Sequence, residues 1–168
     1  MSELFSYYDG ELKDFIAESL TTKDALLKSV ISGVSEKLVK DLKVRGVLID
    51  ESWCHTLDNN AVRHTLRVHG AKSEIKRGQI PIKDEDLLSI PLIVSSYDFL
   101  STGKNKRGQD VVIYTKEMDN GITIYVEEVR LGRHELATTT MYKKKKENSP
   151  TLIDQATQIS DLSSSMQI

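Results

Sequence analysis

Two histidines, His64 and His69, stand five residues apart in the segment AVRHTLRVHG, together with Arg63 and Arg67. Imidazole titrates near neutral pH, so histidine is the side chain that most often moves protons to and from a reacting group. Guanidinium groups bind phosphate through paired hydrogen bonds. These residue types together predict acid-base chemistry on a substrate that contains phosphate.

A helix is expected to carry both histidines. Asp58 predicts its N-cap, and Gly70 predicts its end in a left-handed conformation. At 100° per residue, His69 falls on the apolar side with Val62, while His64 points about 140° away, on the polar side. His69 is therefore the histidine that we expect to meet a neighbouring sheet.

The spacing does not favour a metal site. Zinc ligands on a helix stand three or four residues apart, so His64 and His69 with Glu74 do not form the expected pattern, and we expect neither a metal nor another cofactor. His69 either caps the helix dipole and packs on the sheet or transfers a proton. His64 is either a solvated surface residue or part of the same site. His55 and His134 lie in expected turns without a recognisable partner.

Polar side chains end two expected strands, ITIYVEEVR and ELATTTMYKK. Strand alternation places on one face of the first strand Ile122, Ile124, Val126, Glu128 and Arg130. It places on one face of the second strand Leu136, Thr138, Thr140 and Tyr142. Both faces begin apolar and end polar. Either the core opens into a site at this end of the sheet, or the strands leave the core there.

The other elements predict an α+β fold in which helices precede an antiparallel sheet. Apolar residues at helical spacing predict a helix in GELKDFIAESL and a longer one from about 22 to 44, in which Gly33 could allow a bend. These two helices could pair with each other. The segments DVVIYTK, ITIYVEEVR and ELATTTMYKK have strand composition. Asn120-Gly121 predicts a tight turn between the first two of these strands.

Length and composition predict one domain with appendages. A chain of 168 residues, 39% of them hydrophobic, can form one full core. We expect a helical extension over residues 1–50, an α+β domain over 51–146 and a polar, serine-rich tail over 147–168. A single cysteine, Cys54, and the lack of a long apolar run predict a cytoplasmic protein without a membrane partner.

The net charge of −2 hides an uneven distribution. Residues 62–146 carry 16 lysines and arginines against 11 acidic residues, a net of +5, whereas the flanks carry 7 against 14, a net of −7. A basic central region favours a polyanionic partner such as nucleic acid. The lysines of 143–146 are either a solvated strand end or, with Lys104, Lys106 and Arg107, a rim that attracts phosphate.

Six motifs, HTLRVHG, RGQIPI, IPLIV, VVIYTK, YVEEVR and TTTMYKKK, follow one another in an order that resembles the phage barnase-EndoU-colicin-RelE-like nuclease families. Their members occur as free domains or attached to phage head-morphogenesis proteins of the Mu type. The resemblance covers residues 58–146. It implies N-terminal helices packed on a four-stranded antiparallel sheet, and metal-independent RNA cleavage in which a ribose 2′-hydroxyl attacks the neighbouring phosphate.

The resemblance also implies roles for individual residues. The motif positions expected to be catalytic are His69, His64, Glu128, Arg130, Thr140 and Tyr142. The positions expected to bind substrate are Arg77 and Gln79, from the motif RGQIPI, together with Lys104, Arg107, Lys143 and Lys144, from the basic rim described above. His69 is the stronger candidate for proton transfer, Glu128 is a candidate base and Arg130 a candidate phosphate clamp. Hydroxyls of Thr140 and Tyr142 are expected to hydrogen-bond the scissile phosphate.

We therefore expect a metal-independent endoribonuclease of toxin or phage-effector type, with RNA as its substrate. An immunity or antitoxin protein is a candidate partner for such a toxin, and a phage head protein is another. Two alternatives remain. One is a catalytically silent phage structural or protein-interaction module, and the other is an RNA-binding module without cleavage.

Overall fold

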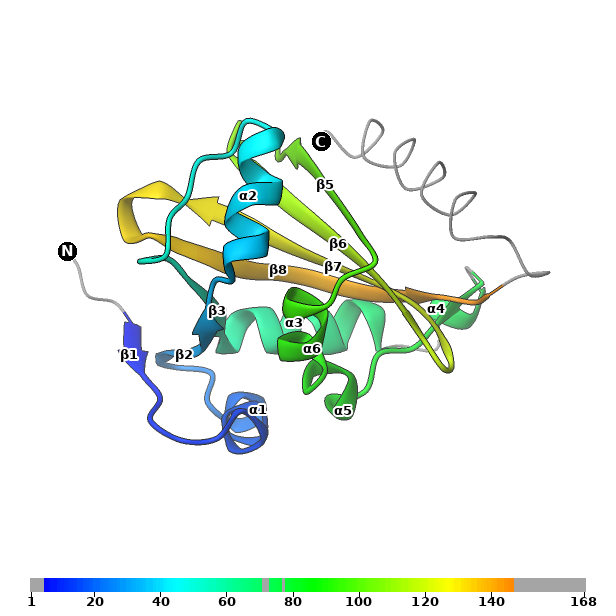
Figure 1. Ribbon diagram of the computed structural model, residues 1–168. Coiled ribbons are helices and arrows are strands. Elements are labelled where there is room, and N and C mark those ends of the chain that lie inside the picture. Colours follow the sequence, from blue (N-terminus) through cyan, green and yellow to red (C-terminus); the bar gives the residue numbers. More distant parts are fainter. Residues whose placement is uncertain (1–4, 71–72, 77, 147–168) are drawn as a thin grey trace.

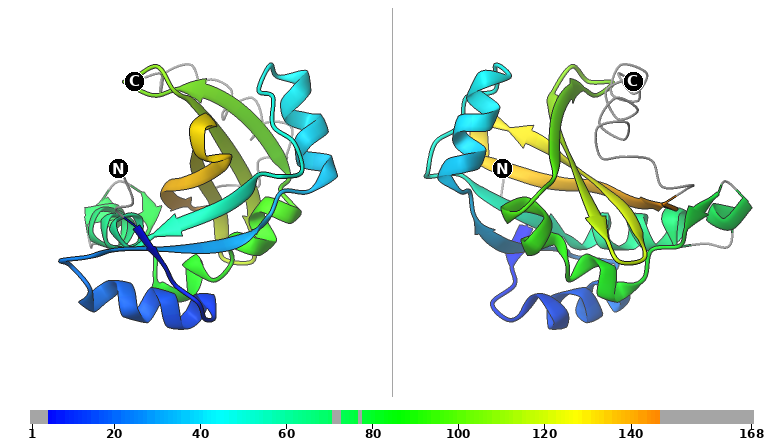
Figure 2. Two further views of the ribbon diagram at one scale, coloured as in Figure 1. Left: turned by 90° about the vertical axis from the view of Figure 1, so that its left-hand side faces the viewer. Right: turned by 45° about the vertical axis from the view of Figure 1, so that its right-hand side comes forward.

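The computed structural model describes residues 5–70, 73–76 and 78–146, and within them eight strands form one mixed sheet. Its strand order is β1-β2-β3-β8-β7-β6-β5, and β4 pairs with β8 beside this path. The strands are β1 (Phe5–Tyr7), β2 (Leu26–Gly33), β3 (Cys54–Asp58), β4 (Gln79–Ile80), β5 (Phe99–Lys104), β6 (Asp110–Met118), β7 (Gly121–Arg130) and β8 (Glu135–Lys144). The sheet is strongly twisted and curved (Figure 2).

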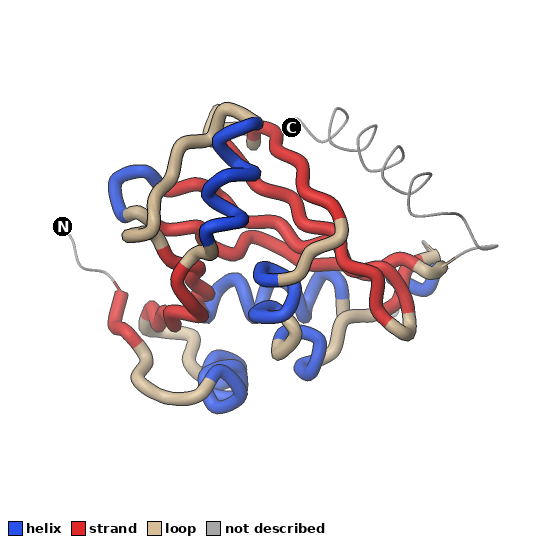
Figure 3. The backbone as a smooth tube through the Cα atoms, in the orientation of Figure 1, coloured by secondary structure: helices blue, strands red, loops and turns tan. Residues whose placement is uncertain are grey.

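Helices α2 and α6 lie over one face of this sheet (Figures 1 and 3). The helices are α1 (Leu12–Thr21), α2 (Glu36–Val44), α3 (Asn59–His69), α4 (Ser73–Lys76), α5 (Asp84–Leu87) and α6 (Ile90–Ser95), and a 3-10 turn follows β7 (Leu131–Arg133). The main apolar core fills the space between the helices and this face, with Phe15, Leu42, Leu57 and Tyr125 among its members. No helix in the described ranges is long and apolar enough to cross a bilayer.

The expected α+β class is confirmed, but a four-stranded antiparallel sheet is not what the structure contains. Strands β5 to β8 are antiparallel neighbours, and the tight turn expected before Gly121 joins β6 to β7. However, β3 pairs with β8 in parallel, and β2 and β1 extend the sheet beyond β3. The sheet is therefore larger than expected and mixed.

The single helix expected from about 22 to 44 is wrong in its first half. Residues Leu26–Gly33 form β2, which pairs with β1 and β3, and only Glu36–Val44 are helical. The β-branched Val30 and Ile31 suit a strand, and two neighbouring strands supply the hydrogen bonds that outweigh the helical spacing. The first 50 residues are thus not purely helical, and the main core runs continuously across residue 50.

The helix α3 begins and ends where the sequence indicates. Asp58 accepts a hydrogen bond from the backbone of Ala61 at 2.8 Å and is the N-cap. Gly70 ends the helix, but with a φ of −95° it is not left-handed. Glycine is required there for space, because a Cβ would lie 2.4 Å from the Leu66 carbonyl oxygen and 2.9 Å from that of Ile82.

A bulge in β8 decides which of its side chains share a face. Val126 pairs with Thr140 and the next residue of β7 pairs with Thr138, which leaves Thr139 without a partner. Thr138 consequently faces the main core, whereas Thr140 and Tyr142 face the opposite side. The regular alternation expected for this strand is therefore wrong beyond Thr138.

Candidate active site

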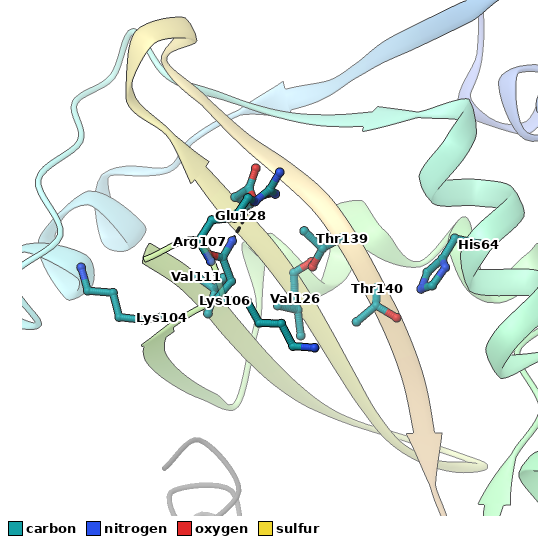
Figure 4. Close-up of a pocket in the computed structure, with 10 residues that line it drawn as sticks. His64, Lys104, Lys106, Arg107, Val111, Val126, Glu128, Thr139 and Thr140 are labelled. Atoms are coloured by element: carbon teal, nitrogen blue, oxygen red, sulfur yellow. Dashed lines mark hydrogen bonds and ion pairs between the residues drawn. The ribbon is translucent and has the colours of Figure 1, made fainter. Parts of the chain in front are cut away.

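A cleft of about 630 Å³ opens on the sheet face opposite the main core (Figure 4). Val111 and Val126 contribute an apolar floor, with hydroxyls of β8 beside them. His64 of α3 stands on one side, and Lys106 and Arg107 of the β5–β6 turn stand on the other. The cleft therefore combines a titratable imidazole with cations that can bind phosphate.

The path of the chain explains why α3 lies beside this cleft. β3 runs parallel to β8, and α3 follows β3 directly, so the helix continues along β8 where β3 has ended (Figure 1). His64 thereby lines the cleft together with Thr140. His69 lies further along β8, with its ring centroid 5.6 Å from that of Tyr142. Helical spacing pointed to His69 alone, yet both histidines lie along β8.

The pKa of His64 is lowered from its ordinary value. Partial burial is the main cause, and the positive charges of Arg67 and His69 add to it. At neutral pH the His64 imidazole is therefore uncharged and keeps a free lone pair. This is the protonation state that a general base requires.

His69 is held by a carboxylate that lies outside the cleft. Its Nδ1 is 3.0 Å from Oε2 of Glu74, whose side chain is fully buried. Tyr142 packs against the His69 ring, and burial raises the pKa of its phenol. The phenol therefore stays protonated at neutral pH and can donate a hydrogen bond.

Glu128 anchors two arginines, Arg107 in the wall of the cleft and Arg130 in an adjoining pocket. Arg107 Nη2 donates to its Oε2 at 2.6 Å, Arg130 Nε donates to its Oε1 at 2.9 Å, and Asn105 also donates to Oε2. The Glu128 side chain is 3% exposed, whereas that of Arg107 is 73% exposed. Because both carboxylate oxygens already accept hydrogen bonds, the geometry suits an anchor better than the general base expected from the sequence.

The threonines of the bulge differ in what they contact. Thr139 Oγ1 donates to the Val126 carbonyl at 3.2 Å. Thr140 Oγ1 is buried and has no hydrogen-bond partner among the described residues. An unpaired buried hydroxyl is unfavourable, so Thr140 is suited to bind a polar atom of a ligand in the cleft.

Two of the lysines expected to bind substrate are already paired. Lys104 lines the cleft, where its Nζ is 2.7 Å from Asp110 Oδ1. Lys143 lies on the other face of β8, almost fully buried, with its Nζ 2.6 Å from Asp86 Oδ1. The bulge and the alternation of β8 thus turn Lys143 away from the cleft, and the structure does not support its expected role in substrate binding.

The remaining expected substrate residues lie at the far end of β8. Gln79 pairs with Lys144 in the β4–β8 ladder, and Gln79 Oε1 is buried without a partner within the described ranges. Burial lowers the pKa of Lys144. Neither residue lines the cleft. Arg77 lies outside the described residues.

A second titratable network lies on the core side of β7. His55 Nδ1 is 2.8 Å from Glu127 Oε2, and the hydroxyls of Tyr114 and Tyr125 donate to the same carboxylate at 2.5 and 2.9 Å. All four side chains are buried. Burial, the main cause, and the Glu127 charge raise the pKa of both tyrosines. This network stabilises the sheet from within and is closed to substrate.

A family model described as phage-Barnase-EndoU-ColicinE5/D-RelE like nuclease3 matches residues 31–149, more than half of the chain. The chain belongs to this nuclease family. The match begins within β2, further toward the N-terminus than the resemblance seen in the sequence motifs. Neither the curated proteins nor the solved structures that were compared include a match.

Sequence motifs alone missed several residues of this nuclease cleft. Asn105 lies in none of the six motifs and donates a hydrogen bond to Glu128. Thr139 lies within TTTMYKKK, but regular alternation did not place it on the same face as Thr140, because the sequence does not reveal the bulge. Outside the cleft, Glu74 stood out in the sequence only as a rejected metal ligand. In the described part of the chain, no group of three or more His, Cys, Asp or Glu residues could hold a metal ion.

Proposed function

We propose that this nuclease is a metal-independent endoribonuclease of toxin or phage-effector type that cleaves RNA by transesterification. The observation that carries the proposal is the composition of the cleft. A histidine with a lowered pKa, His64, lies in it with the unpaired hydroxyl of Thr140 and the exposed guanidinium of Arg107. A base and a phosphate-binding group are thus available within one site.

In the proposed reaction, His64 takes the proton of a ribose 2′-hydroxyl. The 2′-oxygen then bonds to the adjacent phosphorus, and the bond from phosphorus to the 5′-oxygen breaks. His69 supplies a proton to the departing 5′-oxygen. The products are a strand that ends in a 2′,3′-cyclic phosphate and a strand with a free 5′-hydroxyl.

The cations and hydroxyls act on the phosphate. Arg107 and Arg130, held by Glu128, offset the negative charge that develops on the phosphate oxygens. Thr140 and the protonated Tyr142 face the same side of β8 and are suited to donate hydrogen bonds to those oxygens. Lys106, on the same side of the cleft as Arg107, adds further positive charge.

The test is incubation of the whole chain with a single-stranded RNA in the presence of a chelator. We expect cleavage to persist, a product with a 2′,3′-cyclic phosphate, and no cleavage of DNA of the same sequence, which lacks the 2′-hydroxyl. His64→Ala should lower kcat by about 10²–10⁴-fold, as loss of a general base does. The control is His134→Asn, which changes an exposed histidine in a left-handed conformation that asparagine tolerates.

Other outcomes would overturn the proposal. Cleavage that chelator abolishes would contradict metal independence. Salt-sensitive RNA binding without cleavage would indicate a binding module, and neither activity would indicate a structural or interaction module. Growth arrest on expression that a co-expressed neighbouring protein relieves would support the toxin assignment and an immunity partner.

A further inference from the structure

Glu74 is a buried acid outside the cleft that contacts one of the two histidines. It lies in α4, the short helix that follows the end of α3, and its side chain is fully buried. A carboxylate in such a place needs hydrogen-bond donors, because an isolated buried charge is strongly unfavourable. His69 Nδ1, at 3.0 Å from Glu74 Oε2, is one of these donors.

From this contact we infer that Glu74 is the positioning residue of His69, and the inference rests on the proposed ribonuclease function. A carboxylate only accepts hydrogen bonds, so Nδ1 of His69 must carry a proton to face it. The second ring nitrogen, Nε2, is then the one that gains and loses a proton. Glu74 thereby determines which atom of His69 delivers the proton to the departing 5′-oxygen.

The surroundings of His69 hold its ring in one orientation. Tyr142 packs against the ring with an interplanar angle of 31°, and Gly70 ends the helix directly after it. The backbone of Ile82 donates to the His69 carbonyl at 2.8 Å, which ties the helix end to the following segment. The His69 side chain nevertheless remains 16% exposed. The ring is fixed on its Nδ1 side and still accessible.

The positions of the two histidines along β8 give the inference its functional meaning. His64 lines the cleft with Thr140, and His69 contacts Tyr142, two residues further along the same face of β8. A base and an acid are thereby placed at successive positions along one strand. The proton that the acid delivers must lie on Nε2, the nitrogen that points away from Glu74, because the proton on Nδ1 is held by Glu74 and cannot reach the substrate.

The tautomer can be measured directly, without any activity, by nitrogen NMR of the imidazole in the full-length protein. We expect neutral His69 in the wild type to carry its proton on Nδ1, the form that free histidine populates less. In Glu74→Met, an apolar chain of similar length, the Nε2-protonated form should become the major one. Loss of the same signals in His69→Asn assigns them. A wild-type His69 protonated mainly on Nε2 would overturn the inference.

A double-mutant cycle on RNA cleavage separates positioning from mere structural support. Glu74→Met should lower kcat about 10²-fold with little change in KM, because a positioned acid is worth at least this factor. In the His69→Asn background the same substitution should have almost no further effect. Two outcomes would contradict the inference: an equal loss of kcat in both backgrounds, or a loss of kcat that is explained by a parallel loss of thermal stability.

The two proposals fail in distinguishable ways. If the wild type cleaves no RNA, the proposed function falls, while the tautomer measurement still decides the role of Glu74. If RNA is cleaved but His69 has the same tautomer in the wild type and in Glu74→Met, the ribonuclease stands and the positioning role falls. Rescue of kcat by Glu74→Asp relative to Glu74→Met would further support a role for the carboxylate itself.

Discussion

Arg67 stands three residues after His64 on α3 and contributes to the lowered pKa of that imidazole. Replacing it by glutamine should raise the pKa of His64 toward its ordinary value of 6.5. His64 acts as a base only when neutral, so a higher pKa leaves less active enzyme at a given acidic pH. The acid limb of the pH profile of kcat/KM should therefore move to higher pH.

The control for this prediction is Lys40→Gln, which removes an equal charge from the exposed surface of α2. Its acid limb should match that of the wild type. An unchanged limb in Arg67→Gln, or a shift to lower pH, would show that another group governs the profile.

Glu128 offers a second test at the level of single residues. Glu128→Gln should keep the side-chain shape but weaken the hydrogen bonds from Arg107 and Arg130, which lowers the free energy of unfolding by about 1–3 kcal/mol. If Glu128 is an anchor, substrate affinity should fall while the pH profile keeps its shape. Loss of the acid limb would instead identify Glu128 as the base. Chemical denaturation and steady-state kinetics measure the two effects.

The sequence predicts some elements well because their signals are local. The cap at Asp58, the end at Gly70 and the tight turn before Gly121 depend on residues within a few positions of one another. Strand β2 depends instead on pairing with β1 and β3, which no local pattern reveals. Its apolar residues fit a helix equally well, so the sequence alone favoured the wrong element.

The bulge at Thr139 sets the limit for predicting the site. Alternation correctly places Glu128 with Val126 on one face of β7, yet the register shift in β8 has no recognisable signature in the run of threonines. Without that shift, Thr140 would share a face with Thr138, away from the cleft. The sequence therefore identified candidate residues, while their grouping depends on contacts between distant strands.

Gly70 provides a prediction for the end of α3. Gly70→Ala would place a Cβ 2.4 Å from the Leu66 carbonyl oxygen and 2.9 Å from that of Ile82. Both oxygens belong to the backbone and cannot rotate away as a side chain could. We expect a loss of about 1–3 kcal/mol in the free energy of unfolding. Because the helix end carries His69, kcat should also fall.

The matched control is Gly33→Ala at the end of β2, where an added Cβ meets no atom within 4 Å. There the substitution should leave stability unchanged or raise it by roughly 0.4–1 kcal/mol, since alanine restricts the unfolded chain. Thermal unfolding of both variants measures the difference. Equal stability of the two would contradict the steric argument.

At the scale of the whole molecule, an ion pair joins the N-terminal strands to the nuclease sheet. Lys28 of β2 and Glu135 of β8 lie on either side of β3, and their Nζ and Oε1 atoms are 2.9 Å apart. Both side chains are almost fully buried. Strand β2 is therefore bound to β8, the strand that carries Thr140 and Tyr142. A substitution that destabilises the N-terminal strands should also destabilise β8.

Lys28→Met tests this link, because it removes the cation that pairs with the buried Glu135 carboxylate and leaves the Tyr7 hydroxyl as a neutral donor to it. Loss of one member of a buried pair typically lowers stability by about 3–5 kcal/mol. Lys37→Met is the control, since it breaks the exposed pair with Asp41, where about 1 kcal/mol or less is expected. If residues 5–50 and the nuclease sheet form one cooperative unit, Trp53 fluorescence and far-ultraviolet circular dichroism of Lys28→Met should report a single transition at lower denaturant. Two separated transitions, with the later one unchanged from the wild type, would show instead that the N-terminal strands unfold independently of the cleft.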